Sequence, residues 1–133
     1  MKQYLTEFAT LRKKHTKLPV NIWVDDAGTY LNSGHFKRIK FQKNYNNSAI
    51  TNEFAVMLLD GTILEDTLKG CEISNKDLKK IQNFVKNNSL ILSELADARI
   101  DLFDFKELMI TGGEEASKSD IEVQHELLQK YLS

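Results

Sequence analysis

The sequence predicts an α+β fold, in which an antiparallel sheet of four to five strands over about residues 19–69 packs with an N-terminal helix and C-terminal helices. Two kinds of apolar periodicity support this prediction. Between residues 18 and 59 apolar side chains alternate with a period of two, which is typical of half-buried strands. From residue 74 onward they recur at three- and four-residue steps, which indicates amphipathic helices. Strands grouped before helices favour an α+β fold.

The clearest strand begins after Pro19, a residue that suits a strand start because no ladder N–H is needed there. Val20, Ile22 and Val24 fall on one face of this strand. Turn residues follow at 25–28 and 32–34, and residues 36–42 then alternate again. The segment therefore predicts a hairpin or short meander.

The next predicted strand covers residues 53–59 and is apolar on both faces, which is typical of the centre of a sheet. Asp60-Gly61 is a strong signal for a two-residue hairpin turn. Residues 62–64 are expected to begin the return strand.

An amphipathic helix is predicted over residues 2–16, because Leu5, Phe8, Leu11 and His15 recur at helical steps. Pro19 prevents its continuation. Several lysines fall near its C-terminal end, where the helix dipole favours positive charge. This helix is expected to lie on the sheet.

Ser74 is a predicted N-cap that opens a helix, and two interpretations apply to residues 89–110. One is a continuous helix with a heptad seam, and the other is two helices with a tight corner, the second capped by Asp101. We favour two helices. The side chains predicted to form the core are Val20, Ile22, Val24, Ile39, Phe41, Val56, Leu58, Leu78, Ile81, Val85 and Leu95.

The pattern divides the chain into a domain over residues 1–110 and a tail over 111–133. Gly112-Gly113 and the charged residues after it indicate a flexible linker, and a short amphipathic helix capped by Ser119 or Asp120 follows. A helix this short needs a docking surface. That surface is the chain's own domain, a second copy in a homodimer, or another protein. The predicted partner-facing residues are Ile121, Leu128, Tyr131 and Leu132.

Composition narrows the class of protein. The chain has 133 residues, 41% of them apolar and 28% charged, which suits one ordinary domain. Its apolar runs are far shorter than the roughly 18 residues of a membrane span, and its charged start has no secretory signal pattern. The single Cys71 makes no internal disulfide. A soluble cytoplasmic protein that does not enter membranes is expected.

Charge is distributed unevenly along the chain. Residues 12–43 carry eight Lys or Arg against two acids, a net of +6, whereas residues 94–126 carry ten acids against three cations, a net of −7. Such a pattern indicates a basic surface for an anionic partner, an acidic element lying over that surface, or two separate solvated faces.

The candidate binding surface is the basic strand near residues 36–43. Cations beside aromatic rings on an exposed sheet are how single-stranded nucleic acid is held. An equally physical alternative is an ordinary solvated edge with an Arg–Trp cation–π contact. The residues predicted to contact nucleic acid are Trp23, Phe36, Lys37, Arg38, Lys40 and Lys43.

The sequence contains no recognisable catalytic, metal-binding or cofactor motif, and none of these is predicted. The conceivable metal ligands are Asp25, Asp26, His35, Glu53 and Asp60, and a conceivable catalytic pair is Cys71 with His35. Turn roles already explain Asp25, Asp26 and Asp60, and a lone Cys is more often a small buried residue. The prediction is a small non-enzymatic binding or regulatory module. The alternatives are a protein-interaction or oligomerisation module and an enzyme, metal-dependent or Cys-based, that lacks a known motif.

Three stretches carry a resemblance to a known group. They are Leu-Pro-Val-Asn-Ile-Trp-Val-Asp-Asp from Leu18, Gly-His-Phe-Lys-Arg-Ile-Lys-Phe-Gln from Gly34, and Leu-Ala-Asp with Ile-Asp-Leu-Phe-Asp-Phe between residues 95 and 105. With them residues 1–110 resemble a group of small uncharacterised proteins of bacterial and phage genomes. The resemblance implies a small α+β domain and no particular activity.

Overall fold

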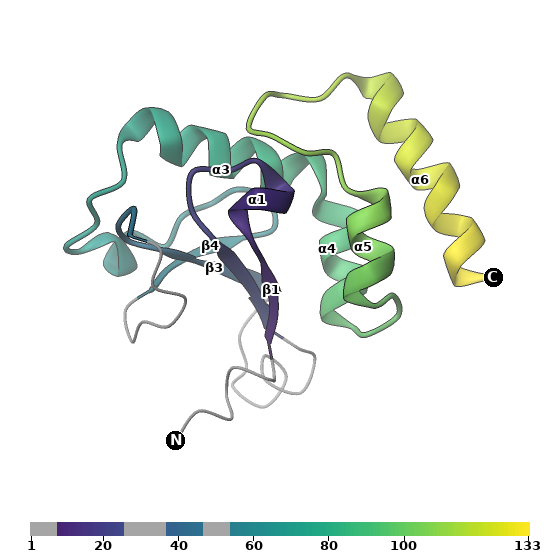
Figure 1. Cartoon of the computed structure of the whole chain (residues 1–133), viewed down its shortest axis with the longest axis horizontal. Helices are drawn as coiled ribbons and strands as arrows, with labels where there is room; N and C mark the ends of the chain where they lie inside the picture. Colours follow the sequence, from purple (N-terminus) through teal and green to yellow (C-terminus); the bar gives the residue numbers. More distant parts are fainter. Residues whose placement is uncertain (1–7, 26–36, 47–53) are drawn as a thin grey trace.

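The protein is described by a computed structural model over residues 8–25, 37–46 and 54–133. Four strands form one antiparallel sheet in the order β1-β2-β3-β4, and helices pack against it (Figure 1). The elements are β1 Phe8–Leu11, α1 Lys13–Thr16, β2 Ile22–Asp25, β3 Arg38–Gln42, β4 Phe54–Leu58, the 3-10 helix η2 Glu65–Leu68, α3 Asn75–Asn87, α4 Ser89–Ala96, α5 Leu102–Leu108 and α6 Lys118–Leu132. The predicted α+β class is confirmed.

One face of the sheet forms the core with the helices. Ile22 lies opposite Phe41, and Phe41 lies opposite Ala55, so these side chains share the face that meets α3 and α4. Alternation along β4 places Ala55 and Met57 on this face. Val56 points to the opposite face and is also buried, whereas the predicted core residues Leu58 and Leu78 are only half-buried. The other predicted core residues are buried: Val20, Ile22, Val24, Ile39, Phe41, Ile81, Val85 and Leu95.

The predicted N-terminal helix is wrong for residues 8–11. They form the edge strand β1, which pairs with β2 from Phe8 opposite Asp25 to Leu11 opposite Ile22. Within the described residues of this predicted helix, only the single turn α1 is helical, and it ends at Lys17 in the left-handed conformation, with φ 67°. Four residues are too few for apolar spacing to separate strand from helix, and pairing with β2 decides the outcome. Residues 2–7 lie outside the described part of the chain.

The predicted return strand at residues 62–64 is reduced to one bridge between Met57 and Ile63. A turn is present, but it is a three-residue loop over residues 59–61 and not the predicted two-residue turn. Gly61, with φ +93°, donates its N–H to the Leu58 carbonyl at 2.9 Å, and the Leu58 N–H donates to the Thr62 carbonyl at 2.8 Å. The chain then bends into η2, and the hydroxyl of Thr67 accepts a hydrogen bond from the Val56 N–H at 3.0 Å. The predicted turns at 26–28 and 32–34 lie outside the described residues.

The helices after residue 74 follow the favoured interpretation. The Ser74 hydroxyl caps α3 by accepting the Asp77 N–H at 3.1 Å. Residues 97–101 form the corner between α4 and α5, and Asp101 and Asp104 form a reciprocal capping box at the start of α5. Two helices, rather than one continuous helix, are confirmed.

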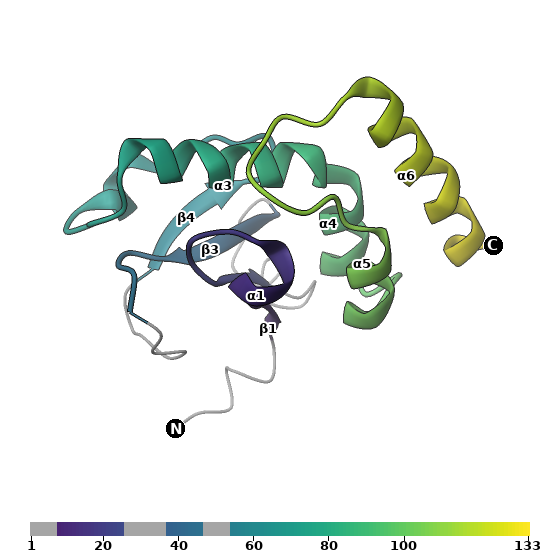
Figure 2. The same cartoon turned by 45° about the horizontal axis from the view of Figure 1, so that its top comes forward.

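The tail helix α6 lies outside α5, on the side away from the sheet (Figures 1 and 2). Its N-cap is Ser117, two or three residues before the predicted caps Ser119 and Asp120, because the Ser117 hydroxyl accepts the Asp120 N–H at 3.0 Å. Leu128 and Gln124 are its buried residues. The chain's own domain therefore supplies the docking surface of this helix. None of the helices in the described residues is both long and apolar enough to cross a membrane.

Candidate functional site

The structure brings Trp23 and Lys40 together, as the basic-strand hypothesis requires, since they are partners across β2 and β3. The Trp23 ring is only 2% exposed and packs edge-on against the Phe54 ring, with centroids 5.1 Å apart. The Lys40 ammonium lies 5.5 Å from the centre of that same Phe54 ring. Trp23 is therefore a packed side chain in this conformation and does not present a face on which a base stacks.

Lys37 and Lys43 stand at opposite ends of β3 and point to different elements. The Lys37 ammonium lies 2.5 Å from the Asp97 carboxylate and 2.6 Å from the Ser93 hydroxyl of α4. The Lys43 ammonium donates to the Lys69 carbonyl at 2.7 Å. Arg38 is half-buried opposite Leu58, and Phe36 lies outside the described residues. The cations predicted to contact nucleic acid therefore lie in several different surroundings.

A second group of cations gathers where α1 meets α5, and we call it the basic cluster. Four of its members, Lys106, Lys14, Lys17 and Arg12, are close enough to the half-buried His15 to lower the pKa of its imidazole (Figure 2 shows α1 beside α5). Across residues 8–25, 37–46 and 54–133, no ion pair joins any of these cations to a carboxylate. A hollow of about 250 Å³ lies beside the cluster and is lined in part by Asn21. The basic cluster comprises Arg12, Lys13, Lys14, Lys17 and Lys106.

The electrostatic effect of the cluster appears at His15. Partial burial of the imidazole lowers its pKa, and the positive charges of Lys106, Lys14, Lys17 and Arg12 lower the pKa further, in that order. The His15 Nδ1 is buried and has no hydrogen-bond partner among the described residues. Both conditions favour the neutral imidazole. The surroundings of His15 therefore carry an excess of positive charge that a bound anion would offset.

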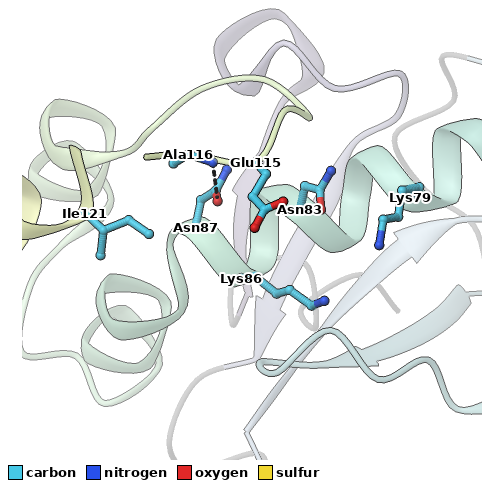
Figure 3. A pocket seen from close by; sticks show the side chains of 7 residues that line it. All are labelled: Lys79, Asn83, Lys86, Asn87, Glu115, Ala116 and Ile121. Atoms are coloured by element: carbon cyan, nitrogen blue, oxygen red, sulfur yellow. Dashed lines mark hydrogen bonds between the residues drawn. The ribbon is translucent and has the colours of Figure 1, made fainter. Parts of the chain in front are cut away.

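A separate pocket of about 180 Å³ lies between α3 and the segment that leads to α6 (Figure 3). Lys79 and Lys86 of α3 stand on one side of it, and Glu115 reaches toward it from the linker. A neighbouring hollow of about 400 Å³ shares Lys86 with it and continues to Leu90. The lining combines both signs of charge with apolar side chains and selects no single class of ligand.

The predicted flexible linker is instead held against α3 by asparagine side chains. Asn83 donates to the Gly113 carbonyl at 2.9 Å, and Asn87 donates to the Glu114 carbonyl at 2.7 Å while accepting the Ala116 N–H at 3.0 Å (Figure 3 shows the last bond). A Cβ at Gly113 would lie 2.8 Å from the Lys80 backbone, so this close approach requires glycine. The segment between α5 and α6 is thus fixed on the domain surface.

Asn88 connects three parts of the chain from a fully buried position. Its amide nitrogen donates to the Phe84 and Ile110 carbonyls, both at 2.9 Å. Its oxygen accepts the Ile110 N–H and the Gln124 side-chain amide, both at 2.8 Å. The same Gln124 amide also reaches the Leu108 carbonyl at 3.2 Å. These bonds fasten α6 to α3 and α5 in an interior where unpaired polar groups are costly.

The residues considered for catalysis or metal binding do not form a site. Cys71 is a half-buried free thiol, and Asp60 accepts the Thr62 N–H at 2.9 Å, an interaction that lowers the pKa of its carboxyl. Among the residues that the structure describes, no three His, Cys, Asp or Glu side chains are grouped as metal ligands. His35 and the side chain of Asp25 lie outside this part.

Comparison of the chain with models of protein families, with curated proteins and with solved structures gives no match.

The sequence pattern places Lys13, Lys14 and Lys17 near the C-terminal end of a predicted helix, where positive charge is favourable. It does not connect Lys106 with residues 12–17, which are far away in the sequence. The available signal was the net charge of +6 over residues 12–43.

Proposed function

We propose that this chain is a non-enzymatic module that binds single-stranded nucleic acid by its phosphate backbone, with the basic cluster as the contact surface. The observation that carries the proposal is that five neighbouring cations, supplied by residues 12–17 and by Lys106 of α5, have no carboxylate partner in the described part of the chain. Phosphates are the anions that such a group of separated cations fits well, because each residue meets a charge of its own.

The proposed partner is the one that the basic strand predicted, single-stranded nucleic acid. The principal contact surface is now the basic cluster and not β3. Arg38 and Lys40 of β3 remain a second candidate surface for the same partner. Base stacking is not part of the proposed contact, because Trp23 is buried and no aromatic ring of the described residues lines the hollow beside the cluster. Binding without stacking depends on charge and is expected to tolerate many sequences.

A homodimer through the C-terminal helix is the other partner that the sequence suggested. Leu128 of α6 is buried in its own domain, so a second copy would have to contact the outward side, at Val123 and Leu127. Glu122 and Glu126 lie beside them. In a symmetric pair these acids would face like charges, which disfavours the dimer.

The proposal predicts a steep dependence of binding on salt. If about four phosphates are neutralised, the slope of log affinity against log salt is about −2.8, so affinity for a 20-nucleotide single strand falls about 50-fold between roughly 50 and 200 mM NaCl. Fluorescence anisotropy of a labelled oligonucleotide measures this change. Absence of binding at 50 mM NaCl would refute the proposal.

Charge reversal locates the contact. Arg12→Glu combined with Lys14→Glu is expected to weaken binding at least about tenfold at 50 mM NaCl, because two phosphate contacts become repulsive. The control is Lys76→Glu combined with Lys130→Glu, which changes the net charge equally at exposed cations elsewhere. Equal losses in the two variants would contradict the assignment. A loss of oligonucleotide affinity seen only with Arg38→Glu would place the contact on β3 instead.

His15 provides a second test, independent of affinity. Because nearby cations lower the pKa of His15, Lys106→Ala should raise it, and a bound oligonucleotide should raise it as well. Proton NMR titration measures these changes, and His15→Gln identifies the signal. Between the lowered pKa and the ordinary value the unfolded chain binds more protons, so this residue reduces stability as the pH falls through that interval. A His15 pKa that the oligonucleotide does not move would place the bound phosphates elsewhere.

A further inference from the structure

The four most exposed large apolar side chains on the C-terminal half of the chain lie on α5 and α6. Phe103 of α5 is 70% exposed, and on α6 Val123 is 51%, Leu127 40% and Tyr131 38% exposed. The three α6 residues are spaced four apart, so they form one stripe beside the docked face of that helix. Single exposed apolar residues are ordinary, but a stripe continued on a second helix is characteristic of a contact surface.

The two helices are joined at this surface by one hydrogen bond. The Tyr131 hydroxyl donates to the Glu107 carboxylate at 2.7 Å, and Phe103 lies one turn before Glu107 on the same side of α5. The exposed rings and Leu127 therefore lie on the surface that α5 and α6 share. We call it the α5–α6 face and define it by Phe103, Val123, Leu127 and Tyr131.

The segment that carries the α5–α6 face is acidic. Residues 101–133 contain eight acids and three cations, a net of −5. Within this set Glu107 borders the face directly, and the exposed Glu122 and Glu126 lie next to the α6 stripe. An apolar surface with an acidic border repels anionic partners, including nucleic acid, and attracts cationic ones.

We infer that the α5–α6 face binds a cationic amphipathic helix of another protein. The apolar side of such a helix covers Phe103 and Leu127, and its lysines or arginines meet the acidic border. This is the helix-in-groove mode of recognition, in which anchors recur at three- and four-residue steps. Charge complementarity selects this occupant over a second copy of the chain, whose own α5–α6 face has the same negative sign.

A designed peptide tests the inference on the full chain. The probe is a peptide of about 18 residues, near the length of α6, made of Leu and Lys with Leu at helical steps. One control has the same composition with Leu scattered around the helix, and another has Glu in place of Lys. The first peptide is expected to bind at least about ten times more tightly than either control. Equal binding of the scattered peptide would overturn the inference.

Two variants locate the binding surface. Phe103→Ser and Leu127→Ser are each expected to weaken the first peptide about tenfold, since exposed anchors commonly contribute that much. Leu64→Ser is the matched control for Leu127→Ser, because Leu64, at 36%, is nearly as exposed as Leu127 and belongs to the segment after β4. Circular dichroism checks that each variant folds. A peptide affinity that responds equally to all three changes would refute the location.

Sedimentation of the chain without peptide tests whether a second copy of the chain occupies the α5–α6 face. The expected result is a monomer in which the peptide forms a one-to-one complex. A dimer that Leu127→Ser dissociates would show that a second copy occupies the α5–α6 face and would overturn the inference.

Discussion

Replacing Asn88 with Ala is expected to lower the free energy of unfolding by about 2–4 kcal/mol, because the change leaves buried polar groups of three segments without partners. The Ile110 N–H loses its acceptor, and the Gln124 amide retains only the longer bond to Leu108. Asn88 itself is fully buried, so water does not reach these groups without a rearrangement. Urea-induced unfolding measures the change.

The matched control for Asn88→Ala is Asn83→Ala, in the helix α3 that Asn88 caps. Asn83 is half-buried and makes one hydrogen bond to the Gly113 carbonyl, so its loss should cost about 1 kcal/mol. Amide hydrogen exchange adds a local readout, since α6 of the Asn88 variant should lose protection before the sheet does. Equal destabilisation by the two substitutions would contradict the central role assigned to Asn88.

Replacing Ile22 with Ala is expected to lower the free energy of unfolding by about 2–5 kcal/mol. Ile22 is fully buried, lies between Leu11 and Phe41 in the sheet, and belongs to the core formed with α3 and α4. Removing most of its side chain leaves a cavity that neighbours on three elements cannot all fill. Thermal or urea unfolding measures the loss.

Ile22→Val serves as the graded comparison, with an expected loss of about 0.5–1.5 kcal/mol for one methyl group. Ile63→Ala adds a contrast, because Ile63 is half-buried at the margin of the same core. A loss at Ile22 no larger than the loss at Ile63 would show that the sheet face is packed less closely than the structure describes.

Features that depend on neighbours in the sequence could be predicted from it. Ser74 and Asp101 were predicted caps and are caps, because a cap binds an N–H only three residues away. The corner between α4 and α5 follows from the same local chemistry. Period-two alternation likewise identified β2 and β3, where one face is consistently apolar.

Features that depend on distant partners could not be predicted. Residues 8–11 resemble a helix in isolation and become β1 only because β2 offers an edge for pairing. In β4 both faces are apolar, so the pattern does not say that Ala55 and Met57, rather than Leu58, meet the helices.

In the candidate surfaces, too, local features could be predicted from the sequence and contacts between distant segments could not. The charge of residues 12–17 is visible in the sequence, but the contribution of Lys106 depends on how α5 packs beside α1. The burial of Trp23 against Phe54 and the pairing of Lys37 with Asp97 also arise from the fold. The composition of the linker predicted a flexible segment, whereas side chains of α3 hold the linker in place.

The segment that follows β4 also affects how the sheet meets other chains. The Val56 N–H is taken by Thr67, the Val56 carbonyl by the Leu64 N–H at 3.0 Å, and the Leu58 N–H by the Thr62 carbonyl at 2.8 Å. An incoming strand would find these ladder groups occupied, so the outer side of β4 from Val56 to Leu58 is closed to sheet extension and to amyloid-like growth. Within the described residues, strand exchange between copies would therefore have to begin at the four-residue β1 or at Phe54, the first residue of β4.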